Sequence, residues 1–578
     1  MTDTKSTDLK NPELYTKYYP EGVKWDSKLE TSPLHKILEH TAQKFPGQDA
    51  FNFLGKTFSW KKLNDEAVYL AGALQKMGVG KGSKIGICLP NCPFYISAYF
   101  GIARTGATIV NYNPLYADEE IRSQIEDSET DMLITADLSL VYDKIEKRFR
   151  DTNLKNIIVC KFPDALPFPK NILFKLFKSG DLAKVNKNDN RVLWFHDLVA
   201  KQTKPEEVDI NTEEDAALFQ YTGGTTGSPK GVMLTHANIT ANISQADAWL
   251  SGVESGQEKM LGVIPFFHVF AMTAVMNLSV YKGFEIFATP RFELEDTLKL
   301  INKHKPTIFP AVPAIYSAIN NRDDLDKYDL SSLKYCISGG APLPVEVKKQ
   351  FENKTGCYLV EGYGLTESSP IVCVNPPGGK NPEGSIGLPL PGTLVKITDK
   401  EDPEKELGLD EAGELCVKGP QVMKGYWGQE EATRDTLVDG WLHTGDVAKV
   451  DEDGFVYIVD RLKDMIITNG YNVYPRHVEE AIYQHPDVEE CIVAGVPDSH
   501  AGEIVKAWIK LKKDKKMSVS ELKSFLEDKI SKIKQPRKIE FRDDPLPKTM
   551  IGKLSRKDIL EEEKHKNQDG KQNIRNTE

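Results

Sequence analysis

One short segment of this sequence combines glycines, hydroxyls and a lysine in a way that favours binding of an anion. Residues 221–231 have the sequence YTGGTTGSPKG. The glycines allow the backbone to approach a phosphate closely and to present N–H groups to it. The hydroxyls add further donors, and Lys230 adds a compact positive charge. The segment therefore predicts a phosphate-binding loop, whose candidate residues are Thr222, Gly223, Gly224, Thr225, Thr226, Gly227 and Lys230.

In a Walker A motif, four residues separate a glycine from a Gly-Lys-Ser/Thr triplet. This loop differs, because Lys230 precedes its glycine and no such triplet is present. A flexible surface turn is the alternative interpretation. Packing a core needs nothing of this composition, so we favour the phosphate-binding interpretation.

A second segment places an aromatic ring, a hydroxyl and a carboxylate within five residues. Residues 361–367 have the sequence EGYGLTE, in which Tyr363, Thr366 and Glu367 carry these groups. A carboxylate beside phosphates is a ligand that Mg²⁺ prefers. Residues 338–342 (SGGAP) follow a predicted strand, and their glycines suit close approach to a flat base or substrate. A plain strand-to-helix turn is the alternative for 338–342.

Four further residues become interesting only if the fold brings them to the same site. Asp446 ends the sequence WLHTGD, Arg461 lies in DRLKD, Lys553 ends PKTMIGK, and His268 lies in the aromatic run PFFHVF. Alone, each has an ordinary interpretation. Asp446 would be a turn carboxylate, Lys553 an exposed lysine and His268 a hydrogen-bonded core histidine.

Together and in this order, these segments resemble the adenylate-forming superfamily of acyl-CoA synthetases, luciferases and peptide-synthetase adenylation domains. The matching segments are residues 221–231, 361–367, 441–446, 460–464 and 547–553, which span nearly the whole chain. The branch that the sequence resembles most is that of the bacterial long-chain fatty acid–CoA ligases. The resemblance implies an α/β fold, with a large multi-sheet N-terminal adenylate-forming domain and a small mobile α+β C-terminal domain.

The resemblance implies roles in ATP binding for most of these residues. Tyr363 would stack on adenine, Thr366 would contact the α-phosphate, and Glu367 would bind Mg²⁺ together with Thr226. Asp446 and Arg461 would bind the ribose. The other implied nucleotide contacts are Gly339, Gly340, Ala341, Glu361, Gly362 and Gly364.

The resemblance also implies roles toward the acid and the thiol. Lys553 would bridge the substrate carboxylate and the α-phosphate during adenylation, where its charge stabilises the transition state. His268 would line the acyl pocket. For the second step the C-terminal domain would rotate about Lys463, which brings the loop with Gly470 and Tyr471 to the pantetheine arm of CoA. Many relatives have two adjacent glycines in that loop, whereas this chain has one.

The elements that must position these residues alternate between strand and helix as far as residue 460. A strand at 84–89, a helix at 94–104 and a strand at 107–110 illustrate the pattern, which indicates α/β units around largely parallel sheets. Beyond residue 461 the pattern changes to a compact α+β unit, whose second helix starts at a capping box at 518–521. We expect an N-terminal domain at 1–460, a mobile C-terminal domain at 461–560 and a disordered polar tail at 561–578.

The composition narrows the class of protein. The chain has 578 residues, a formal net charge of -11 and 8 cysteines. The acidic balance argues against non-specific nucleic-acid binding, and the cysteine spacing favours reduced, mostly buried thiols. The start of the chain has no signal-like apolar segment, and no run approaches the ~18 apolar residues of a membrane span. We therefore expect a cytoplasmic protein, with the oligomeric state open between monomer and homodimer.

One basic and apolar segment leaves two interpretations open. Residues 166–178 combine aromatic residues and lysines without any acid. They form either a small interfacial patch for the anionic inner face of the membrane, or a surface helix whose apolar side covers the core. We favour the surface helix.

The leading functional hypothesis is a long-chain fatty acid–CoA ligase that uses ATP, Mg²⁺ and CoA and releases AMP and pyrophosphate. An aryl- or medium-chain acyl-CoA ligase, or transfer of the acyl group to a carrier protein, is the alternative. A non-catalytic fatty-acid or nucleotide binding protein is a different class, and the presence of both Glu367 and Lys553 argues against it.

Overall fold

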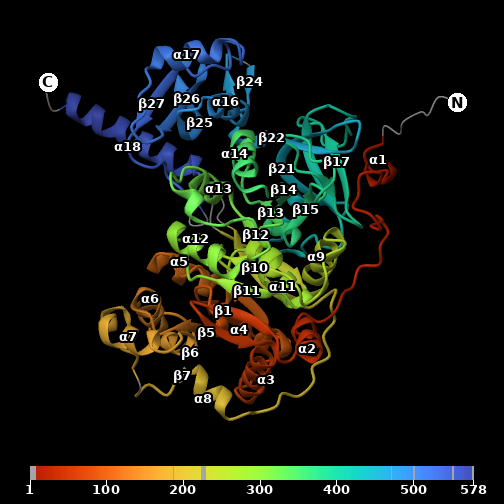
Figure 1. Cartoon of the computed structure of the whole chain (residues 1–578), viewed down its shortest axis with the longest axis vertical. Helices are drawn as coiled ribbons and strands as arrows, with labels where there is room; N and C mark the ends of the chain where they lie inside the picture. Colours follow the sequence, from red (N-terminus) through yellow and green to blue (C-terminus); the bar gives the residue numbers. More distant parts are fainter. Residues whose placement is uncertain are drawn as a thin grey trace.

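The computed structural model describes residues 8–186, 188–222, 229–469, 471–498, 501–549 and 552–575, with side chains as far as Lys566. Two large sheets and a smaller third sheet build the body of the molecule, and a fourth sheet forms a separate unit at its C-terminal end (Figure 1). No helix among the described residues is both long enough and apolar enough to cross a lipid bilayer.

The first large sheet has eight strands and is mainly parallel. The expected unit of strand, helix and strand is present in it: β3 (Lys84–Cys88) and β4 (Thr108–Asn111) pair in parallel and are joined by α4 (Pro93–Arg104). The strand order is β19 (Gly425–Tyr426), β9 (Lys230–Thr235), β8 (Ala216–Thr222), β4, β3, β5 (Met132–Ala136), β6 (Asn156–Cys160) and β7 (Val192–Trp194).

The second large sheet has nine strands and is parallel in its centre, with antiparallel pairing at both edges. In order they are β16 (Leu388–Pro389), β15 (Ile371–Val374), β14 (Tyr358–Gly364), β13 (Tyr335–Ser338), β12 (Ile308–Ala311), β10 (Lys259–Gly262), β11 (Glu285–Ala288), β1 (Asp49–Phe53) and β2 (Lys56–Ser59). Buried residues of both large sheets belong to one continuous core. The two sheets therefore form a single rigid frame.

A small antiparallel sheet and the C-terminal unit complete the fold. The small sheet contains β17 (Leu394–Thr398), β18 (Gly413–Lys418), β21 (Trp441–Val450), β20 (Leu437–Val438) and β22 (Val456–Arg461). The C-terminal sheet contains β24 (Tyr471–Val473), β23 (Ile466–Thr468), β26 (Gly502–Leu511), β25 (Val488–Asp498) and β27 (Lys538–Arg542). The C-terminal unit has its own apolar clusters, separate from that of the large sheets.

Helices cover the faces of these sheets. Residues from α5 and α6 pack with the eight-stranded sheet in a second apolar cluster. The capping box predicted at 518–521 is present, because the Ser518 side chain accepts the Glu521 N–H and the Glu521 carboxylate accepts the Ser518 N–H. The longer helices are α2 (His35–Lys44), α3 (Trp60–Lys76), α5 (Asp118–Ser128), α6 (Ser139–Phe149), α7 (Lys170–Phe177), α9 (His236–Trp249), α12 (Leu294–His304), α13 (Pro313–Asn320), α14 (Val345–Thr355), α16 (Pro475–Tyr483), α17 (Val519–Glu527) and α18 (Arg556–Arg575).

The last helix covers most of the segment 561–578, for which we expect a disordered polar tail. The backbone is helical through Arg575, and α18 extends away from the C-terminal unit (Figure 1). Ion pairs hold its first turns, since Glu562 lies 2.7 Å from Arg542 and Glu563 lies 2.7 Å from Lys506. Charged side chains, rather than apolar ones, make these two contacts.

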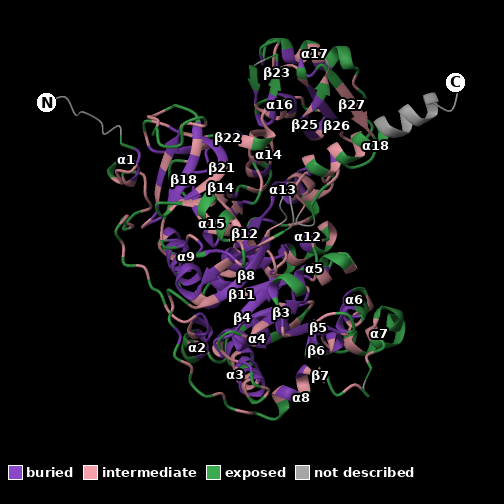
Figure 2. Ribbon diagram, turned by 180° about the vertical axis from the view of Figure 1, so that it is seen from behind, coloured by how far each residue is buried: buried purple, intermediate pink, exposed green. Residues whose placement is uncertain are grey.

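The segment at 166–178 also differs from what we favoured. It does form a surface helix, α7, but none of the helix residues is buried. Phe174 packs on the core beside Phe162, with ring centroids 5.5 Å apart, whereas the rest of the apolar side is exposed (Figure 2). The large exposed apolar residues are Phe168, Ile172, Leu173, Leu176 and Phe177. The apolar side of α7 therefore does not cover the core.

Candidate active site

A cavity of about 1550 Å³ lies where the large sheets, the small sheet and the C-terminal unit meet. Most of the predicted site residues line it. They are Thr222, His268, Gly339, Gly340, Ala341, Glu361, Gly362, Tyr363, Gly364, Thr366, Glu367, Asp446, Arg461, Lys463 and Lys553. Segments far apart in the sequence thus converge on one cavity.

Several predicted residues are not among those that line the cavity. Tyr471 is 62% exposed, so in this arrangement its ring faces solvent. The Lys230 ammonium lies over the ring of Tyr426, 4.6 Å from its centroid. Gly223, Gly224, Thr225, Thr226, Gly227 and Gly470 lie outside the described residues.

The ends of the predicted phosphate loop are fixed by an antiparallel strand pair. Thr222 at the end of β8 lies opposite Lys230 at the start of β9. The two residues that flank the predicted loop therefore lie side by side, and Thr222 lines the cavity.

Two parallel strands present the segments at 338–342 and 361–367 side by side. Ser338 in β13 lies opposite Glu361 in β14. One oxygen of the Glu361 carboxylate accepts the N–H of Leu343 at 3.1 Å, which ties the turn after β13 to β14. Burial raises the pKa of Glu361 to about 7. Glu361 therefore holds the turn that carries Gly339, Gly340 and Ala341.

A hydrogen-bonded triad joins the nine-stranded sheet to the small sheet. The Tyr363 hydroxyl donates to Asp446 at 2.6 Å, and the Arg461 guanidinium lies 3.2 Å from the other oxygen of the same carboxylate. Asp446 and Arg461 are opposite one another in β21 and β22, and Asp446 is buried. The triad holds a carboxylate acceptor beside an aromatic face, which suits a ribose and its base.

The chemistry of Glu367 fits a divalent cation. Its carboxylate accepts the Tyr426 hydroxyl at 2.9 Å, and burial raises its pKa above the ordinary value. A raised pKa means that the negative charge is poorly compensated, so a hard cation such as Mg²⁺ would stabilise it. The predicted second ligand, Thr226, lies outside the described residues.

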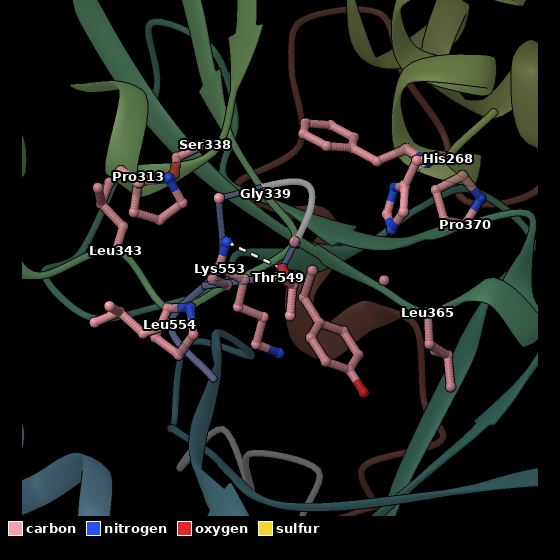
Figure 3. Close-up of a pocket in the computed structure, with 18 of the residues that line it drawn as sticks. His268, Pro313, Ser338, Gly339, Leu343, Leu365, Pro370, Thr549, Lys553 and Leu554 are labelled. Atoms are coloured by element: carbon pink, nitrogen blue, oxygen red, sulfur yellow. Dashed lines mark hydrogen bonds between the residues drawn. The ribbon is translucent and has the colours of Figure 1, made fainter. Parts of the chain in front are cut away.

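Lys553 reaches the cavity from the loop that precedes α18 (Figure 3). Thr549 and Lys553 are held together, because the Lys553 N–H donates to the Thr549 hydroxyl at 3.2 Å and the Lys553 carbonyl accepts the Thr549 N–H at 2.6 Å. Burial and then the charge of Arg461 lower the pKa of Lys553 to about 8. The Lys553 ammonium can therefore attract an anion that enters the cavity.

His268 lines the cavity opposite Lys553 (Figure 3). Its Nδ1 accepts the Phe270 N–H at 3.3 Å, so the proton of the neutral ring lies on Nε2. Burial, followed by the charge of Lys553, lowers the pKa of His268 to about 4. The ring is therefore a neutral donor at physiological pH.

The predicted hinge residue lies in a short 3-10 turn between β22 and β23. Lys463 is in the turn Leu462–Asp464, and burial lowers its pKa. Next to it, Arg556 forms ion pairs with Asp464 at 3.1 Å and with Glu479 at 2.7 Å. These contacts join the turn to the C-terminal unit.

Sequence reasoning missed two partners of the site. Tyr426 contacts both Glu367 and Lys230, but it lies far from each in sequence and carries no local signal. Arg556 lies three residues after Lys553, and the segment that points to Lys553 ends before it. Each residue is recognised only when distant strands are placed together.

The fold and this cavity are those of an AMP-binding enzyme, and the chain belongs to that family. The family model for AMP-binding enzymes matches residues 38–427, and the model for the AMP-binding enzyme C-terminal domain matches residues 477–553.

The relatives sharpen the family assignment. The long-chain-fatty-acid–CoA ligase of Bacillus subtilis is 46% identical over 94% of this chain and 97% of its own length. That of Salmonella typhimurium is 38% identical over 92% of this chain and 95% of its own. Among solved structures, the anthranilate CoA ligase AuaEII with anthranoyl-AMP has a TM-score of 0.81, at 27% identity, and covers 93% of this chain and 98% of its own. ATP-bound MatB from Rhodopseudomonas palustris has a TM-score of 0.80, at 27% identity, and covers 92% of this chain and 99% of its own.

Proposed function

We propose that this protein is an ATP-dependent long-chain fatty acid–CoA ligase. It joins a fatty acid to AMP and then transfers the acyl group to CoA, with release of pyrophosphate and AMP. The observation that carries the proposal is the position of Lys553, which shares one cavity with Glu367 and Asp446 although it belongs to the C-terminal unit. Full-length relatives that are named long-chain-fatty-acid–CoA ligases support the same conclusion.

In the first half-reaction, a carboxylate oxygen of the acid attacks the α-phosphorus of ATP and pyrophosphate leaves. Tyr363 stacks on the adenine, and Asp446 accepts the ribose hydroxyls. Lys553 holds the carboxylate against the α-phosphate and balances the charge that develops there. Mg²⁺ bound at Glu367 would supply charge neutralisation of the phosphates. His268 can donate from Nε2 to the carboxylate.

In the second half-reaction, the CoA thiol attacks the carbonyl of the adenylate, AMP leaves, and the thiol proton passes to solvent. Lys553 lines the cavity in the arrangement described above, so it must withdraw before the thiol enters. We propose that residues 461–560 rotate as a domain against residues 1–460, about Lys463. Such a rotation would bring Tyr471, now exposed, to the pantetheine arm.

The apolar part of the cavity supports a long alkyl chain as the substrate. Besides His268, the end of α9 and the helical segment 269–282 contribute apolar side chains to the lining. Part of that segment is a π-helix, Met272–Asn277, which is wider than an α-helix. The apolar lining residues there are Ala246, Trp249, Leu250, Val269, Phe270, Ala274 and Leu278.

Pyrophosphate release tests the proposal directly. The rate is measured with acids from acetate to stearate and with benzoate, with CoA present and with CoA omitted. We expect the highest kcat/KM with long-chain acids and formation of the matching acyl-CoA. Release with benzoate-like acids alone would move the function to an aryl-CoA ligase. Absence of pyrophosphate release with every acid tested would overturn the ligase proposal.

We further propose that the enzyme works in the cytoplasm and docks on the anionic inner face of the membrane through α7. The α7 patch consists of Phe168, Ile172, Leu173, Leu176 and Phe177. Phe168 is 79% exposed and Phe177 is 81% exposed, and Lys170, Lys175 and Lys178 flank them. Exposed aromatic side chains that are flanked by lysines suit insertion below anionic headgroups, where the fatty-acid substrate resides.

Sedimentation with lipid vesicles tests this docking. We expect binding to phosphatidylglycerol vesicles, weakened by salt, and little binding to phosphatidylcholine vesicles. Burying one phenylalanine contributes about 1.5–3 kcal/mol, so Phe177→Ser should weaken binding about tenfold or more. Val519→Ser is the matched control, since Val519 is an exposed apolar residue on the distant α17. Equal loss in both variants would contradict the α7 patch.

A further inference from the structure

Three side chains outside the proposed nucleotide contacts form a compact set of metal-binding groups. Glu414 and Cys416 are two residues apart on β18, so they point to the same face of the small sheet. His443 lies opposite Cys416 on the neighbouring strand β21. Among the described residues, this is the group whose three ligand atoms all lie within 4.8 Å of one another.

The distances within this cluster approach those of a metal site. His443 Nδ1 lies 3.5 Å from Cys416 Sγ and 2.9 Å from a carboxylate oxygen of Glu414. In a tetrahedral zinc site, bond lengths of about 2.1–2.3 Å place neighbouring ligand atoms about 3.4–3.6 Å apart. The sulfur-to-nitrogen distance already fits. The nitrogen-to-oxygen distance would have to lengthen by about 0.5 Å, which a side-chain rotation of Glu414 can supply.

A purely structural role explains only part of this arrangement. The other oxygen of Glu414 accepts the Gly445 N–H at 3.0 Å, so Glu414 and His443 hold the part of β21 that precedes Asp446. Cys416 is not needed for that purpose. Its thiol is buried yet belongs to none of the apolar clusters, and its sulfur faces His443 and, at 3.6 Å, the hydroxyl of Thr398.

The surroundings allow a cation to enter. The side chains of His443 and Glu414 are each 14% exposed, so two of the three side chains reach the surface, whereas Cys416 is buried. Lys396 lies opposite Cys416 on β17, so it shares this face. Its ammonium is directed toward Glu406, 3.6 Å away, and the Trp441 ring, 4.9 Å from the centroid. Its charge is thus partly compensated away from the cluster.

We propose that Glu414, Cys416 and His443 bind one zinc ion, with water as the fourth ligand. On binding, the thiol of Cys416 releases its proton to solvent, and the thiolate and the carboxylate together balance the charge of Zn²⁺. A thiolate and an imidazole select zinc over Mg²⁺, which separates this site from the magnesium that accompanies ATP. The chemistry differs from that of Glu367, whose only ligand atoms are hard oxygens.

Zinc at this site should inhibit adenylation. To bind the ion, Glu414 and His443 must change the contacts that hold residues 443–446 of β21, including the bond to Gly445. Asp446 follows directly and holds Tyr363 and Arg461. We therefore expect bound zinc to raise the KM for ATP rather than to block the acyl part of the cavity.

Direct metal binding by the full-length protein is the first test. The reduced protein is titrated with Zn²⁺ against a chromophoric chelator, and separately with Co²⁺, whose thiolate complexes show a charge-transfer band in the near ultraviolet. We expect one equivalent of zinc and a cobalt band. Loss of a direct ligand should weaken binding at least about tenfold, so Cys416→Ser should show weaker zinc binding and no band.

The matched control is Cys373→Ser, because Cys373 is also buried but sits in the main apolar core. Its zinc affinity and cobalt band should equal those of the parent. His443→Gln provides a second ligand variant should Cys416→Ser fail to fold, and it should weaken the cobalt band. The proposal is overturned by a parent protein that retains no zinc against the chelator, or by ligand variants that bind as tightly as the parent.

Discussion

Lys553 and His268 face one another across the cavity (Figure 3). Lys553 belongs to the C-terminal unit, whereas His268 follows β10 of the nine-stranded sheet. The charge of Lys553 contributes, after burial, to lowering the pKa of His268 to about 4. His268 is therefore neutral when Lys553 is charged. Only one of these two groups can act as the cation that attracts a carboxylate, and it belongs to the unit that we propose to rotate.

Glu367→Gln tests the proposed magnesium ligand. The amide is isosteric and can still accept from Tyr426, so the fold should be retained, whereas the charge that attracts Mg²⁺ is lost. We expect adenylation to fall about 100-fold or more and to require a higher Mg²⁺ concentration. Pyrophosphate release is measured across a magnesium titration, with thermal unfolding as the check on folding. A magnesium dependence identical to that of the parent would exclude Glu367 as the ligand.

The pH dependence of adenylation should report on Lys553. Its pKa is about 8, below the ordinary 10.5, so the ammonium loses its proton within the alkaline range of a normal assay. Because the charged form is the one that holds the carboxylate, the rate should fall as the pH rises through about 8. The pH dependence of kcat/KM for adenylation, which reports groups of the free enzyme, measures this limb.

Lys553→Arg is the control for this pH dependence. A guanidinium stays charged throughout the assay range, so the alkaline limb should disappear even if the overall rate is lower. An alkaline limb that persists unchanged in Lys553→Arg would assign it to another group.

Arg556→Met tests the ion pairs beside the hinge. The change leaves the carboxylate of Glu479, whose side chain is 16% exposed, without the guanidinium that now lies 2.7 Å away, and it removes the bond to Asp464. We expect a loss of about 3–5 kcal/mol in the stability of the C-terminal unit, seen as a lower unfolding temperature. Arg537→Met is the control, because Arg537 is exposed. Equal unfolding temperatures for the two variants would show that the hinge ion pairs do not stabilise the unit.

Local patterns predicted the fold well where one element decides its own form. The alternation at 84–110 gave β3, α4 and β4, and the capping box at 518–521 gave the start of α17. These features depend on side chains a few residues apart. The convergence of Asp446 and Lys553 on one cavity was expected from the resemblance alone, because no local pattern relates them.

Features that depend on distant partners could not be predicted. The amphipathic pattern of α7 is the same whether its apolar side is covered or exposed, and only the packed structure shows it exposed. The contact of Tyr426 with Glu367 and the cluster of Glu414, Cys416 and His443 require knowledge of which strands pair. The first part of α18 forms ion pairs with β26 and β27, which lie far from it in sequence.

The most direct test of the account separates the two half-reactions in Lys553→Ala. Pyrophosphate release from fatty acid and ATP measures adenylation, and acyl-CoA formation from supplied acyl-AMP measures thioester formation. Because Lys553 acts only while it occupies the cavity, adenylation should fall by at least about 100-fold while thioester formation stays close to that of the parent. Equal loss of both half-reactions, or retention of adenylation, would contradict the central claim.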